Sequence, residues 1–150
     1  MKGYFAIPAI VLLLSGILAQ LGENSPIEFA LEHKIVASCV MGVFLLILYF
    51  KRIDYDRWGM AIFEIICSIV HIVFSIIVCF SFMELIRGEG VSGSLVVVLC
   101  SITYLATEGA WFVAMALSAE GKRVMSVLVG APSTLYALML VADTIYNYFY

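Results

Sequence analysis

Apolar residues run along this chain in five long stretches that are separated by short polar connectors. A helix needs about 20 residues to cross the roughly 30 Å hydrocarbon layer of a bilayer, and each stretch is close to that length. No stretch alternates apolar and polar residues over ten positions, as the strands of a membrane barrel do. The pattern predicts an all-α, multi-pass transmembrane helical bundle that forms one domain over residues 1–150. The predicted helices cover residues 4–21, 31–50, 58–86, 93–118 and 124–148.

The composition agrees with a membrane location. Of the 150 residues, 64% are hydrophobic and only 13% are charged, and the mean hydropathy is +1.11. A soluble domain contains roughly 45–50% apolar and about 25% charged residues. These values argue against a soluble enzyme, a disordered chain and a disulfide-stabilised secreted domain.

The basic residues predict an orientation, because Lys and Arg are in excess on the cytoplasmic side of membrane proteins. If the N-terminus is cytoplasmic, six basic residues lie inside and two lie outside, and the outer connectors are acidic instead. Five crossings then place the C-terminus on the outer side. The inner residues are Lys2, Lys51, Arg52, Arg57, Lys122 and Arg123, and the outer ones are Lys34 and Arg87.

The first apolar stretch has two interpretations. Residues 1–4 followed by the apolar residues 5–19 are also typical of a secretory signal peptide. The cleavage site is poor, because Ile17 stands where a small residue is expected, so we favour an uncleaved helix. Cleavage would leave four helices and would reverse none of them.

Polar side chains at membrane depth are costly, so they mark candidate functional residues. Glu64, Ser68, His71 and Ser75 follow one another at i, i+4, i+7 and i+11, which places them on one face of the third predicted helix. Glu108 lies in the fourth predicted helix. A short connector joins these two helices, so we expect them to pack antiparallel and Glu108 to contact His71. These five residues form the predicted intramembrane polar cluster.

Two interpretations of this cluster remain open. It is either a buried polar lock, meaning hydrogen-bonded side chains that fix the register of the helices, or a proton path through Glu64, His71 and Glu108. We favour the lock, with Glu108 neutral or paired to His71, because three ionisable groups offer no evident water-filled route across the membrane. An aromatic-lined pocket that opens to lipid would instead indicate a bound lipid or hydrophobic cofactor.

No cofactor, metal or catalytic residue is predicted. His33 and His71 differ in depth by roughly 15 Å, which argues against a haem held between them. The cysteines form no C-x-x-C motif, so neither a zinc site nor a dithiol oxidoreductase is indicated. They are expected to be small, buried apolar residues of the helices. The four cysteines are Cys39, Cys67, Cys79 and Cys100.

Small residues predict where helices approach one another closely, because they allow the backbones to come together. Ser38 and Gly42 are four residues apart in the second predicted helix, and Gly109 lies in the fourth. Pro8 and Pro132 fall inside the first and last predicted helices and are expected to kink or interrupt them.

Two segments carry a resemblance to a known family. Residues 32–44, EHKIVASCVMGVF, and residues 107–112, TEGAWF, resemble the Snakeskin family of insect tetraspan proteins of smooth septate junctions. The short outer loops and the polar third helix are similar to MARVEL-type tetraspan proteins more broadly. The resemblance covers residues 31–118. It implies a non-enzymatic role in cell–cell junction assembly or membrane apposition, with Glu108 as the intramembrane acid of the motif.

The chain also departs from that family pattern. Those proteins have four helices and two cytoplasmic ends, whereas this sequence has a fifth apolar span and a predicted outer C-terminus. We therefore expect a non-enzymatic integral membrane protein that packs against partner membrane proteins or copies of itself in the lipid bilayer, without a nucleic-acid partner. The alternative is a small transporter, channel or membrane-enzyme subunit with a Glu/His proton relay.

Overall fold

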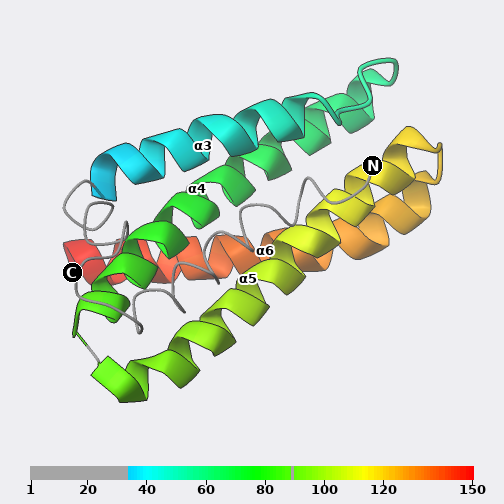
Figure 1. Ribbon diagram of the computed structural model, residues 1–150. Coiled ribbons are helices and arrows are strands. Elements are labelled where there is room, and N and C mark those ends of the chain that lie inside the picture. Colours follow the sequence, from blue (N-terminus) through cyan, green and yellow to red (C-terminus); the bar gives the residue numbers. More distant parts are fainter. Residues whose placement is uncertain (1–33, 89) are drawn as a thin grey trace.

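The computed structural model describes residues 34–88 and 90–150, and all the regular structure in them is helical. Figure 1 shows the four described helices as one bundle. Helix α4 is central, because it packs against each of the other three, and α5 also packs along α6. The helices are α3 (Lys34–Phe50), α4 (Trp58–Gly88), α5 (Gly90–Ala119) and α6 (Arg123–Phe149).

The all-helical fold predicted from the sequence is confirmed, with four described helices where five are predicted. Helices α3 to α6 correspond to the second to fifth predicted helices. The first predicted helix, the signal-peptide alternative, Pro8 and His33 lie outside the described residues.

Three of the described helices are long and apolar enough to cross a membrane. The spans are Trp58–Ser81, Val98–Ala119 and Arg123–Phe149. The 17 described residues of α3 extend about 25 Å at 1.5 Å per residue. Large apolar side chains are exposed on every described helix, which water would penalise and lipid accommodates. The protein is a membrane-embedded helical bundle.

One predicted connector is shorter than expected and one predicted break is absent. The connector expected over residues 87–92 is largely taken up by helix, because α4 continues to Gly88 and α5 already begins at Gly90, although the two remain separate helices. At Pro132, where a kink or an interruption is expected, the helix is not interrupted, since α6 runs through this residue. Each backbone polar group that stays in a helix is satisfied without water, and proline removes only one such bond, so continuous helices are favoured in lipid.

The two basic connectors lie together at one end of the bundle (Figure 1). Helix α5 ends in a Schellman motif: Gly121 has a φ of 83°, and the N–H of Lys122 donates to the carbonyl of Leu117 at 2.8 Å. A Cβ atom on Gly121 would lie 3.4 Å from Nη2 of Arg57, which belongs to the other connector. Residues 51–57 and 120–122 therefore face the same side of the membrane.

Small side chains bring α5 and α6 close together. A Cβ atom on Gly130 would lie 3.0 Å from both Cβ of Ala114 and Cζ3 of Trp111, and the hydroxyl of Ser126 donates to the Ala114 carbonyl at 2.6 Å. The buried residues of α6 repeat at intervals of three or four and so form one face. They are Ser126, Gly130, Ser133, Ala137 and Val141.

The packing residues named from the sequence have different environments. Gly42 is buried, and a Cβ atom there would lie 3.1 Å from Cδ1 of Ile76, so it marks a close contact between α3 and α4. Gly109 is half-buried. Ser38 belongs to α3, but its side chain lies outside the described part of the structure.

Candidate functional site

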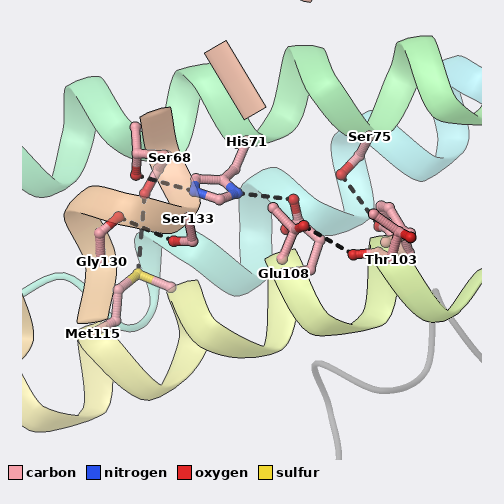
Figure 2. Close-up of polar contacts among 11 residues, drawn as sticks. Ser68, His71, Ser75, Thr103, Glu108, Met115, Gly130 and Ser133 are labelled. Carbon is pink, nitrogen blue, oxygen red and sulfur yellow. Dashed lines mark hydrogen bonds and ion pairs between the residues drawn. The ribbon is translucent and has the colours of Figure 1, made fainter. Parts of the chain in front are cut away.

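His71 is the centre of the polar cluster and joins three helices. Its side chain is fully buried, and Nδ1 lies 2.9 Å from Oε1 of Glu108 on α5. Nε2 lies 3.1 Å from Oγ1 of Thr134 on α6. Figure 2 shows the imidazole ring pointing from α4 toward the Glu108 carboxyl group. The contact between His71 and Glu108 that the sequence predicts is therefore present, and Thr134 adds a third helix to it.

Aromatic rings enclose the histidine. The indole of Trp111 stacks on the imidazole, with ring centroids 5.1 Å apart and planes 10° from parallel. Tyr49 of α3 meets the same imidazole edge-on at 6.5 Å and also packs on Phe112 at 4.9 Å. Trp111 and Tyr49 are themselves buried. The hydrogen-bonded pair is thus shielded from lipid and from water by side chains of α3 and α5.

A second polar pair lies one helical turn away. The hydroxyl of Tyr104 donates to Oγ of Ser75 at 3.1 Å, and the Tyr104 ring stacks on Phe74 with centroids 6.0 Å apart. Ser75 follows His71 by four residues on α4, and Tyr104 precedes Glu108 by four residues on α5. The two pairs therefore belong to one antiparallel register, which a shift of either helix would break in both places.

Glu64 and Ser68 have other partners. Oε2 of Glu64 accepts a hydrogen bond from the backbone N–H of Asp54 at 3.0 Å, so this buried carboxyl group anchors the connector between α3 and α4. Oγ of Ser68 donates to Sδ of Met115 at 4.0 Å (Figure 2). Glu64 lies seven residues, or roughly 10 Å, from His71 along α4. The five predicted residues are all buried, but the structure joins only His71 and Glu108 directly among them.

Three residues that contact His71 are absent from the sequence-based cluster: Tyr49, Trp111 and Thr134. Trp111 follows Glu108 by three residues, a spacing that places both on one face of α5 and could have indicated it. Thr134 stands two residues after Pro132, in the segment where the sequence predicts a kink or an interruption. The Thr134 hydroxyl reaches His71 because of how α6 is rotated relative to α4. The spacing of residues within a single helix does not predict that rotation.

Several buried polar atoms of the site have no hydrogen-bond partner among the described residues. These are the Tyr49 hydroxyl, Oε1 of Glu64, Oε2 of Glu108 and Nε1 of Trp111. In lipid an unsatisfied polar group costs several kcal/mol of free energy. These atoms are therefore the least favourable part of a cluster that is otherwise hydrogen-bonded.

The cysteines differ from the prediction that all are buried. Cys67 and Cys79 are buried, but Cys39 and Cys100 are exposed on α3 and α5. The thiol is small and only weakly polar, so it is tolerated on a lipid-facing surface as well as inside.

The site can hold helices in register and can hold a proton between His71 and Glu108. Among the described residues, no hydrogen bond joins Glu64 directly to either member of that pair. No protein-family model, curated protein or solved structure matches the chain.

Proposed function

We propose that this chain is a non-enzymatic integral membrane protein: a rigid helical bundle that packs laterally against partner membrane proteins or copies of itself. The observation that carries the proposal is the position of His71, whose two nitrogens contact Glu108 and Thr134 on separate helices. Both hydrogen-bonding positions of the ring are used inside the protein, as a polar lock requires. A bundle held in one register presents a constant outer surface.

The outer surface supports an associative role. Helix α3 exposes Val43, Leu46 and Ile47, and α6 exposes Leu135 and Met139. Helices associate in membranes through close van der Waals packing rather than through a hydrophobic driving force, so a fixed surface shape favours a specific partner. The resemblance of residues 32–44 and 107–112 to a junctional tetraspan family makes a cell–cell junction the setting we propose.

The proposed orientation places both basic connectors in the cytoplasm and the C-terminus outside. Supporting this, Arg57 and Gly121 meet at one end of the bundle, where Lys51, Lys122 and Arg123 also lie. A protease site inserted in residues 120–122 should be protected in sealed, right-side-out vesicles, and one appended after Tyr150 should be cleaved. The reverse pattern would contradict the orientation.

A proton relay is the second candidate, and one observation favours it. Oε2 of Glu108 is buried without a hydrogen-bond partner in the described residues and could exchange a proton with His71. The relay through Glu64, His71 and Glu108 would also need Glu64 to be connected to the other two residues. The Glu64 carboxyl group instead accepts a hydrogen bond from the Asp54 N–H.

The deciding experiment compares proton flux and association in the same preparations. Proteoliposomes with an internal pH-sensitive dye are made from the wild type, Glu108→Gln and the exposed-site control Glu120→Gln, and native mass spectrometry reads the assemblies. We expect no flux above that of protein-free liposomes and a defined homo- or hetero-oligomer. A flux that Glu108→Gln abolishes and Glu120→Gln retains would replace the lock with the relay, and a monomer without partners in native membranes would contradict association.

A further inference from the structure

A half-enclosed cavity of about 480 Å³ lies among α4, α5 and α6, beyond the Ser75–Tyr104 pair as seen from His71. Its walls come from residues 74–81, 99–104 and 136–144. At 1.5 Å per residue these walls are roughly 8–12 Å long. All three lie within the candidate membrane spans. The volume is within the range of about 300–1,000 Å³ that is typical of ligand pockets.

The cavity has an aromatic floor and opens sideways. Phe74 and Tyr104, stacked on one another, are both buried and form its base. At its rim Leu99 is 55% exposed and Tyr136 is 41% exposed. Because these residues belong to membrane-spanning helices, the opening faces the hydrocarbon layer rather than water.

Three of the five hydroxyl groups of the lining are engaged within the protein, and the other two belong to Ser81 and Tyr136, which are exposed. Thr103 donates to the Leu99 carbonyl at 2.9 Å, Thr144 donates to the Leu140 carbonyl at 2.8 Å, and Tyr104 donates to Ser75. These three donors are therefore not available to a ligand. On the buried floor a sugar, a phosphate or an ionised group would therefore lose its hydration without a free donor to replace it, whereas an unbranched hydrocarbon chain would lose nothing.

We infer that this cavity binds one acyl chain of a membrane lipid, which lies parallel to the helices on the Phe74–Tyr104 floor with its headgroup outside the cavity. The inference does not depend on the proposed associative function. It assigns the cavity a lipid as a structural component of the bundle, held by shape and by contact with the aromatic floor.

The test measures retained lipid on the intact chain. The protein is reconstituted in nanodiscs of a single phosphatidylcholine, transferred to a mild detergent and examined by native mass spectrometry. We expect one retained phosphatidylcholine per chain. Cys100→Trp, which places an indole in the cavity, should lose nearly all of it. The matched control is Ile102→Trp, on the same helix at a position that is 53% exposed and outside the lining, and it should retain the lipid.

A second variant and a second readout keep the outcome interpretable. If Cys100→Trp does not fold by circular dichroism, Leu140→Phe fills the cavity from the opposite wall. Photolabelling with a diazirine on the acyl chain should mark residues 99–104 in the wild type and in Ile102→Trp. Two results of the lipid measurement would overturn the inference: a wild type that retains no lipid, or equal retention in the filled and control variants. A cross-linker attached at residue 100 that reacted with a second copy or with another part of the chain would overturn it as well.

Discussion

The indole of Trp111 lies flat on the imidazole of His71 and at the same time faces Gly130 on α6. Its ring is 5.1 Å from the imidazole, and its Cζ3 would be 3.0 Å from a Cβ atom on Gly130. One side chain of α5 thus fills the space between the histidine of α4 and the glycine of α6. The polar cluster and the close packing of α5 with α6 are therefore one structural unit.

Gly130→Ala should destabilise the bundle by about 1–3 kcal/mol, because the added methyl group meets the Trp111 ring and Ala114, neither of which can turn aside. Reversible unfolding in mixed micelles measures the change. The control is Gly59→Ala: this glycine is also in a helix, but a Cβ atom there meets nothing within 4 Å. It should be neutral or stabilising by about 0.5–1 kcal/mol. Equal effects at the two glycines would refute the close approach.

His71→Phe and Glu108→Met should each cost about 1–3 kcal/mol, since each leaves the remaining partner buried without its hydrogen bond. The phenyl ring keeps the stacking on Trp111. The double variant should cost less than the sum of the two by about 1 kcal/mol or more, because it leaves neither group unsatisfied. The unfolding free energies of the four proteins measure this coupling. Strict additivity would show that the pair does not act as a unit.

Tyr104→Phe should lower the unfolding free energy by about 0.5–1.5 kcal/mol, because it removes the hydrogen bond to Ser75 while keeping the ring on Phe74. Tyr49→Phe is the matched control. The Tyr49 hydroxyl is buried without a partner among the described residues, so its removal should be neutral or stabilising. A larger loss for Tyr49→Phe than for Tyr104→Phe would contradict these assignments.

Glu64→Leu should release the connector between α3 and α4, because no acceptor remains for the Asp54 N–H. Hydrogen exchange at the Asp54 amide should become faster by about two- to tenfold, given that a hydrogen bond contributes about 0.5–1.5 kcal/mol to stability. Glu64→Gln keeps a side-chain oxygen at this place and should preserve most of the protection. Unchanged exchange in Glu64→Leu would mean that the carboxyl group does not anchor the connector.

The sequence predicts the described helices well, because long apolar runs bounded by charged residues have few alternatives in lipid. The face that carries Ser68, His71 and Ser75 could also be predicted, since helical periodicity places them together. The partners of this face on other helices are harder to predict from the sequence. The contact with Glu108 could be predicted from the short connector between α4 and α5, but the contact with Thr134 depends on how α6 is rotated.

Two features could not be inferred from residue types at all. Glu64 looks like a member of the cluster by spacing, yet its partner is a backbone N–H, which every residue possesses and no sequence pattern distinguishes. Pro132 looks like an interruption, but the small side chains around it allow α6 to pass close to α5 as one helix. Both depend on the spatial arrangement of neighbours rather than on local preference.

His71 contacts residues that are synthesised 37 and 63 positions later in the chain. When α4 leaves the ribosome its imidazole therefore has neither partner, and exposure of that group to lipid would cost several kcal/mol. We therefore expect this face of α4 to stay against the insertion machinery until Glu108 and then Thr134 have been synthesised. We accordingly expect the helices to enter the bilayer together, after α6 has been synthesised, and not one at a time.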